Sequence, residues 1–320
     1  MASIGSLGLW AGFAAIVILM LAIDLWVVGG GKEHRVGLKE AAIWSAIWIS
    51  VTLAFAGGLW WHLDGSLGRE VANSRVLEFI TGYLIEKALA IDNVFIWLML
   101  FGYFAVPLEL QKRVLLYGVL GAILMRSGLI FAGAWLIAQF HWILYLFGAF
   151  LLITGIKMYW FAEGAANLDH NPLLKWLRRH LKISQDFDGQ RFFTRRDGIR
   201  YATPLFLTLV LVEVSDLIFA VDSIPAIFAI TTDPFIVLTS NIFAILGLRA
   251  MYFLLADFAD RFSLLKYGLA AVLMFIGIKM LLLDIYSIPI GVSLGIVASL
   301  IGLAVVASLR HDARPSRRSS

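Results

Sequence analysis

The sequence predicts an all-α polytopic membrane protein with about nine transmembrane helices, two sets of which form inverted three-helix repeats. Composition, the spacing of apolar runs and internal self-similarity predict this fold class. Of 320 residues, 61% are hydrophobic and 15% are charged, and the mean hydropathy is +0.87. Soluble domains are nearer to half apolar and about a quarter charged. One soluble core of this size could not hide such an excess, so the lipid bilayer is the expected environment.

A membrane-spanning helix needs about 20 mostly apolar residues. These runs lack the alternation of apolar and polar residues that is typical of an outer-membrane barrel. No Lys or Arg precedes the first run, so we expect it to be a retained helix and not a cleaved secretory signal. The qualifying runs lie at about 7–28, 41–61, 77–103, 114–137, 142–160, 203–230, 235–256, 265–284 and 288–308.

Lys and Arg collect in alternate linkers. Basic linkers face the cytoplasm in most polytopic proteins, which predicts an outside N-terminus and a cytoplasmic C-terminus. Arg69 and Arg75 are exceptions on the outer side. The net charge of +4 comes from these loops, so nucleic-acid binding is not expected. The basic segments are 29–40, 104–113, 161–202, 257–264 and the tail, and the segments without Lys or Arg are 138–141, 231–234 and 285–287.

Three charged markers repeat in the same order along the chain, which is a signature of internal duplication. Under the expected topology the two copies are inverted relative to each other, a construction that many secondary transporters use. The pairs are 90–93 (AIDN) with 220–223 (AVDS), Arg126 with Arg249, and 155–158 with 277–280 (both GIKM), at offsets of 130, 123 and 122 residues.

The repeat divides the chain into five parts. We assign two N-terminal helices to 1–76, the first repeat to 77–160, a basic cytoplasmic loop to 161–202, the second repeat to 203–284, and the last helix with a basic tail to 285–320. Within the loop, the amphipathic stretch 173–181 is expected to lie on the anionic membrane surface. A regulatory role of the loop is the alternative.

Several carboxylates lie within the predicted spans, where each ionised acid costs a few kcal/mol and needs a polar partner. Some of them are expected to pair with basic residues and the rest to hold a cation or a proton. The candidate metal ligands are Glu86, Asp92, Asn93, Glu213, Asp216, Asp222 and Ser223. The candidate charge partners are Arg126, Lys157, Arg249 and Lys279, to which Lys87 adds a further charge. Asp24 is either an entrance residue or an interfacial one.

The chemistry of the ligands indicates a hard cation. Carboxylates, an amide and a hydroxyl suit Mg²⁺, Ca²⁺ or Mn²⁺, while soft Cu⁺ is disfavoured. The six His residues lie in linkers, at span ends or in the tail, so a His-rich zinc site is not expected. Pro225 lacks the N–H that would bond the carbonyl of Val221, so we expect the helix to be broken beside Asp222. Such a break would offer a carbonyl to a cation.

Three stretches resemble the signatures of the TerC family. The likeness covers about residues 8 to 305, and within the family the chain resembles the Alx-like subgroup most. The three stretches are 83–95 (YLIEKALAIDNVF), 213–226 (EVSDLIFAVDSIPA) and 239–252 (TSNIFAILGLRAMY). The resemblance implies an inner-membrane exporter of Mn²⁺, with relatives tied to alkaline-pH and tellurite responses. It also implies that Glu86, Asp92, Glu213, Asp216 and Asp222 are the metal-pathway acids.

The predicted function is therefore Mn²⁺ efflux by alternating access, with protons as a plausible coupling ion and with no permanently bound cofactor or enzymatic activity. Members of the group have been described as redox modulators, but this chain has no cysteine for thiol chemistry. One alternative is a non-transporting membrane metal sensor or a partner that supports metalation. Another is an intramembrane aspartyl protease, although the Gly-x-Gly-Asp environment of such enzymes is absent at Asp92 and Asp222.

Overall fold

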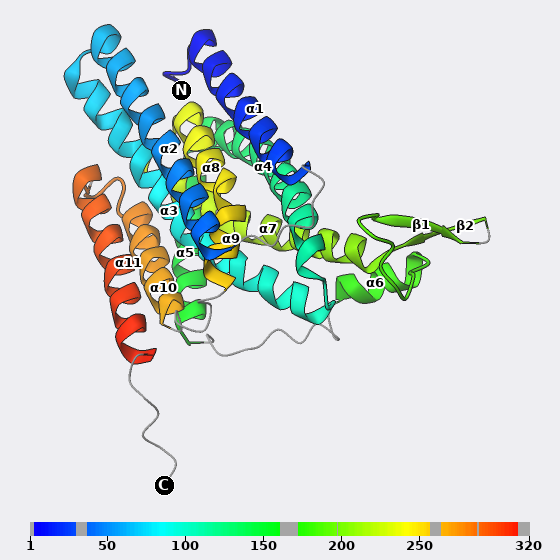
Figure 1. Cartoon of the computed structure of the whole chain (residues 1–320). Helices are drawn as coiled ribbons and strands as arrows, with labels where there is room; N and C mark the ends of the chain where they lie inside the picture. Colours follow the sequence, from blue (N-terminus) through cyan, green and yellow to red (C-terminus); the bar gives the residue numbers. More distant parts are fainter. Residues whose placement is uncertain are drawn as a thin grey trace.

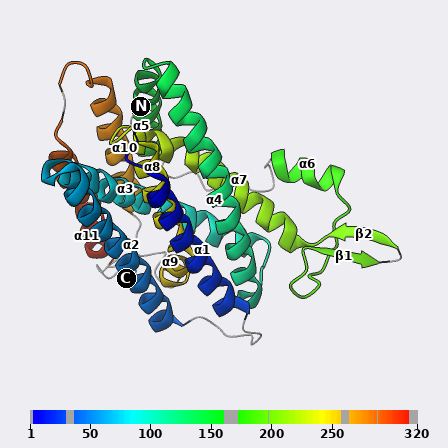
Figure 2. The same cartoon turned by 90° about the horizontal axis from the view of Figure 1, so that it is seen from above.

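The computed structural model describes residues 3–29, 37–160, 172–196, 198–256, 264–286 and 288–312. The long helices form one bundle, and α6 with the β1–β2 hairpin projects from one side of it in both views (Figures 1 and 2). The elements in chain order are α1 (Leu7–Gly29), α2 (Leu38–Leu67), α3 (Arg69–Tyr103), α4 (Leu108–Gln139), α5 (Ile143–Trp160), α6 (Pro172–His180), β1 (Phe193–Arg196), β2 (Ile199–Ala202), α7 (Pro204–Phe228), α8 (Pro234–Leu246), α9 (Leu248–Ala256), α10 (Leu265–Leu281) and α11 (Ile290–Asp312).

The helices confirm the all-α polytopic class. Within the described ranges, six helices are long and apolar enough to cross a membrane, or seven if the bent pair α8–α9 counts as one span. The remaining predicted runs fall on α3, which carries Glu78, Glu86 and Lys87, and on α10, which has 17 residues. The prediction of nine crossings therefore stays a prediction.

The outside of the bundle is apolar, as a lipid environment requires. Large hydrophobic side chains stand exposed along several helices, among them Ile18 on α1, Leu124 and Trp135 on α4, and Leu303 on α11. Such extended apolar surface is rare on soluble monomers and marks contact with a membrane or a partner. The polar groups instead gather inside, where α3, α4, α7 and α8 pack on one another.

The helix interruption is not where the sequence predicted it. α7 continues through Pro225 to Phe228, so the expected interruption beside Asp222 is wrong. Pro225 lies three residues before the helix end, where its missing N–H removes little of the remaining hydrogen-bond ladder. The interruption lies at Gly247, where α8 and α9 meet at a 40° bend.

Helices α5 and α10 pack closely through glycines. A Cβ on Gly277 would lie 2.8 Å from the carbonyl oxygen of Gly148, and one on Gly155 would lie 2.8 Å from that of Ala270. Ascending positions on α5 thus meet descending positions on α10, so the two helices run antiparallel. At the repeat offset of 122 residues, Gly148 corresponds to Ala270 and Gly155 to Gly277. The two contacts are therefore reciprocal.

The loop between the repeats contains structure that the sequence did not predict. The amphipathic stretch is helix α6, and its apolar residues Leu174 and Leu177 are buried in a cluster with residues of α4 and α7. A two-stranded antiparallel hairpin, β1–β2, follows it. The strands alternate little in hydrophobicity, which explains why no sheet was expected.

Some predictions fall outside the described residues. These are the basic markers within 30–36, the first part of the loop (161–171), Arg261 in the turn 257–263, and Arg314, Arg317 and Arg318 in the tail. The side chain of Asp92 also lies outside the described part, although its backbone belongs to α3.

Candidate functional site

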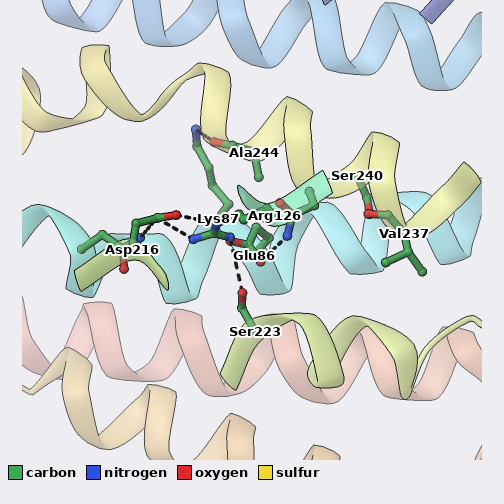
Figure 3. A network of polar contacts seen from close by, with 10 residues as sticks. Glu86, Lys87, Arg126, Asp216, Ser223, Val237, Ser240 and Ala244 are labelled. Carbon is green, nitrogen blue, oxygen red and sulfur yellow. Dashed lines mark hydrogen bonds and ion pairs between the residues drawn. The ribbon is translucent and has the colours of Figure 1, made fainter. Parts of the chain in front are cut away.

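The centre of the site is the guanidinium of Arg126, which α4 places between α3 and α7 (Figure 3). Arg126 Nε donates to Asp216 Oδ2 at 3.0 Å and Nη2 donates to Asp216 Oδ1 at 2.8 Å. Its Nη1 forms an ion pair with Glu86. All three side chains are at most 2% exposed. A bidentate guanidinium suits two carboxylates because its donors are planar and stay charged.

Two amides hold the outer sides of the same carboxylates. Asn93 Nδ2 on α3 donates to Asp216 Oδ1 at 3.1 Å, and Asn241 Nδ2 on α8 donates to Glu86 Oε2 at 3.0 Å. This fixes each amide's orientation, since a flip would set oxygen against oxygen. The carbonyl oxygens of both amides are buried and have no hydrogen-bond partner among the described residues. Each such buried acceptor costs about 1–3 kcal/mol unless a donor or cation satisfies it.

Ser223 and Glu213 border the cluster from α7. Ser223 Oγ lies 3.4 Å from Arg126 Nη1, at the lower side in Figure 3. The Glu213 carboxylate lies directly against Gly121 of α4, at a point where any side chain would collide with it. One oxygen of Glu213, Oε2, is buried and has no hydrogen-bond partner in the part of the chain that the structure describes. Besides Glu86 and Asp216, the site therefore has a third carboxylate, that of Glu213, with an oxygen that could bind a cation.

Asp222 points elsewhere. It is half-buried, and its carboxylate interacts with Thr154 of α5. The structure therefore brings together Glu86, Asn93, Asp216 and Ser223, sets Glu213 beside them, and leaves Asp222 at the α5–α7 contact.

The other predicted charge partners also lie apart. Arg249 at the start of α9 pairs with Asp24 of α1, which is 4% exposed. Lys279 is buried on α10, where it is attracted electrostatically by Glu78. Lys157 is exposed in the last turn of α5. Of the four predicted partners, Arg126 is the one whose ion pairs bind the central acids.

Two polar residues next to the cluster have contacts that the sequence did not predict. Asn241 was recognised only as part of a motif, and its signal was an amide within the apolar run 235–256. Lys87 was expected to neutralise acids, but its Nζ donates to the carbonyl of Ala244 at 3.1 Å. That carbonyl lies at the C-terminal end of α8, where helix carbonyls lack amide partners and attract positive charge. Figure 3 shows Lys87 extending to it.

By formal charge the cluster has one acid in excess, because one guanidinium faces two carboxyl groups. Among the described side chains, no group of three or more His, Asp or Glu residues is arranged to hold a metal ion. Arg126 binds both oxygens of Asp216 and pairs with Glu86. In this state the arrangement is a closed ion-pair network with one acid in excess and unsatisfied oxygens at its edges.

Comparison with known proteins places this arrangement in a family. Residues 71–316 match the model of the integral membrane protein TerC family. A protein of Photorhabdus laumondii is 59% identical over 96% of both chains, and one of Escherichia coli K12 is 58% identical over 98% of both. Both are named as a proposed membrane-bound redox modulator, Alx.

A membrane protein of Myxococcus xanthus, described as uncharacterised, is 50% identical over 96% of this chain and 93% of its own. No solved structure matches the chain. The family match covers more than half of the sequence and contains every central residue of the Arg126 cluster. The chain therefore belongs to the TerC family of integral membrane proteins.

Proposed function

We propose that this protein is a secondary transporter of divalent cations in the bacterial inner membrane, with Mn²⁺ efflux as its activity and protons as the counter-ion. Its N-terminus lies outside and its C-terminus in the cytoplasm. The observation that carries the proposal is the buried cluster of Glu86, Asp216 and Arg126, in which two carboxylates face one guanidinium. Ionisable groups inside a membrane bundle are costly and mark ion pathways.

The available ligands fit a hard cation. Beside the carboxylates stand the unpartnered oxygens of Asn93, Asn241 and Glu213. A cation that enters the cluster gains these oxygens as ligands and removes the cost of leaving them unsatisfied. Oxygen-only sites suit Mn²⁺, Mg²⁺ and Ca²⁺, and selection among these ions depends on ligand number and cavity size. Asp92 is proposed as a further ligand from its place on α3 and from the family resemblance.

Alternating access is supported by the internal repeat. In the proposed architecture, α3–α4–α5 and α7–α8/α9–α10 are inverted copies with the site between them. The reciprocal antiparallel contact between α5 and α10 supports this arrangement, because a two-fold axis brings each position against its partner's counterpart. The central carboxylates Glu86 and Asp216 are likewise counterparts at the offset of 130 residues.

The name of the Alx relatives suggests a redox role, which this chain could not perform with thiols because it has no cysteine. A change in cellular redox state would follow indirectly from altered metal levels. Transport therefore accounts for more of the structure than direct electron transfer through protein sulfur does.

The test is transport by the purified full chain in liposomes that contain a Mn²⁺-quenched dye. The parent should quench the dye, and Glu86→Gln and Asp216→Asn should abolish quenching while their melting temperatures in detergent report folding. Asp64→Asn is the matched control, since Asp64 pairs with Arg69 at the exposed end of α2. Mn²⁺ binding without any uptake by the parent would refute transport and favour the non-transporting metal sensor.

A further inference from the structure

The two repeat arginines have different partners, although they occupy corresponding positions. Arg126 lies inside continuous helix α4 and binds Glu86 and Asp216. Arg249, its counterpart at 123 residues, lies just after the α8–α9 break and binds Asp24 of α1. Helix α1 belongs to neither repeat and precedes the part of the chain that the family model matches.

The packing register shows where Arg249 would lie without the break. A Cβ on Gly118 of α4 would lie 3.1 Å from Val212 of α7, and a Cβ on Gly82 of α3 would lie 2.8 Å from Ser240 of α8. Gly82 corresponds to Val212, and Ser240 is adjacent to the counterpart of Gly118. Helix α8 thus lies on α3 in nearly the register in which α4 lies on α7.

Continuing that register leads to a second ion pair. On α4, eight residues beyond Gly118, Arg126 reaches Asp216 of α7. On a straight α8–α9, the corresponding Arg249 would reach the counterpart of Asp216, which is Glu86. The bend of 40° at Gly247 directs Arg249 to Asp24 instead. In α4 the position of Gly247 is taken by Leu124, and that helix is unbroken.

The bend is held by contacts at three places. Lys87 Nζ binds the Ala244 carbonyl and would lie 2.6 Å from any Cβ at Gly247, so the ammonium fills the space at the break. Helix α1 fastens both parts of the pair. Its start is fixed by Ser3 Oγ and Ile4 N–H, which donate to Asp233 at the N-cap of α8, each at 2.8 Å. Its inner end is fixed by the Asp24–Arg249 ion pair.

We propose that the α8–α9 pair is the moving gate of the transporter and that Arg249 exchanges Asp24 for Glu86 when the pair straightens. In the bent state Asn241 occupies the outer oxygen of Glu86. In the straight state the guanidinium of Arg249 replaces Asn241 at that oxygen of Glu86. Glu86 is then paired with Arg126 in both states and with Arg249 in the straight state as well. The ion pair of Asp24 with Arg249 stabilises the bent state. This inference rests on the proposed transport function.

A charge exchange tests whether Arg249 has a second partner. Asp24→Arg and Arg249→Asp alone should each lose transport, because each buries an unpaired charge. The double variant restores the ion pair with α1, so its melting temperature should return towards the parent's. Its transport should stay lost, since an acid at position 249 is repelled by Glu86. Full recovery of transport together with stability would overturn the proposal and leave Arg249 a purely structural residue.

A distance measurement tests the motion without relying on metal transport. The chain has no cysteine, so spin labels can be attached to Thr232→Cys and Ala256→Cys at the two ends of the α8–α9 pair. Adding Asp24→Asn should shift the distances towards longer values, and adding Arg249→Met as well should reverse the shift. An unchanged distribution in Asp24→Asn would overturn the gate. Absence of Mn²⁺ uptake by the parent would refute the transport function alone.

Discussion

The two repeat arginines show how one residue type serves two purposes. Arg126 is enclosed by a continuous helix, two carboxylates and a hydroxyl, and each of its three side-chain nitrogens has at least one partner. Within the described ranges Arg249 makes one ion pair, next to a glycine and a bend, with a helix from outside the repeats. The number and burial of the partners, and not the residue itself, separate a fixed centre from a position that can change partner.

The largest expected effect comes from removing the central guanidinium. Arg126→Met leaves Glu86 and Asp216 facing each other without a cation, so we expect a loss of about 3–5 kcal/mol of stability, typical of breaking a buried ion pair. Arg249→Met leaves one carboxylate, Asp24, and should cost clearly less. Thermal unfolding in detergent measures both. Equal losses for the two variants would contradict the distinction between the two arginines.

A smaller effect is expected at the contact between the repeats. Gly155→Ala places a methyl group against the backbone of α10, at Ala270 and Met274, which cannot move without separating the helices. Overpacking of this kind costs about 1–3 kcal/mol. Gly128→Ala on α4 is the matched control, because no atom lies within 4 Å of its added methyl group and alanine favours helix. If both variants unfold at the same temperature, the glycine contact contributes nothing to the assembly.

The smallest effect is expected at the break itself. Gly247→Ala collides with the end of the Lys87 side chain, which can turn away, and its next neighbour, Trp48, lies at 3.4 Å. The cost is the hydrogen bond from the Lys87 ammonium to Ala244, about 1.5 kcal/mol, at the lower end for a charged donor. Lys87→Met combined with Gly247→Ala should lose little more than Lys87→Met alone in the same melting experiment. A loss as large as that of Gly155→Ala would mean that Lys87 is held rigidly.

Much of the candidate site could be predicted from sequence because burying charge is so costly in a membrane. The buried acids Glu86 and Asp216 needed a positive partner, which Arg126 supplies. The repeat indicated which helices carry these residues. Asn241 was missed as a ligand of the acids because an isolated amide in an apolar run has no characteristic spacing. The partner of Arg249 was also missed, since Asp24 lies 225 residues away in the chain and outside the repeat.

The break was misplaced for a similar reason. Pro225 is a strong local signal, but a proline near the end of α7 has few hydrogen bonds left to disturb. Gly247 is a weak local signal that becomes decisive only when Lys87 from α3 fills the space beside it. A local pattern predicts a tendency to bend, and the neighbouring helix determines whether the bend forms.

Composition and periodicity by themselves determined that this chain is a helical membrane protein with acids inside its predicted spans. With 61% hydrophobic residues the chain needs a lipid environment, and a backbone within lipid must satisfy its own hydrogen bonds, as a helix does. Only the tertiary structure decided which of those acids are joined by Arg126, which oxygens remain unsatisfied, and which arginine turns outward to α1. Those choices depend on contacts between residues far apart in the chain, where helix register and a few glycines set the distances.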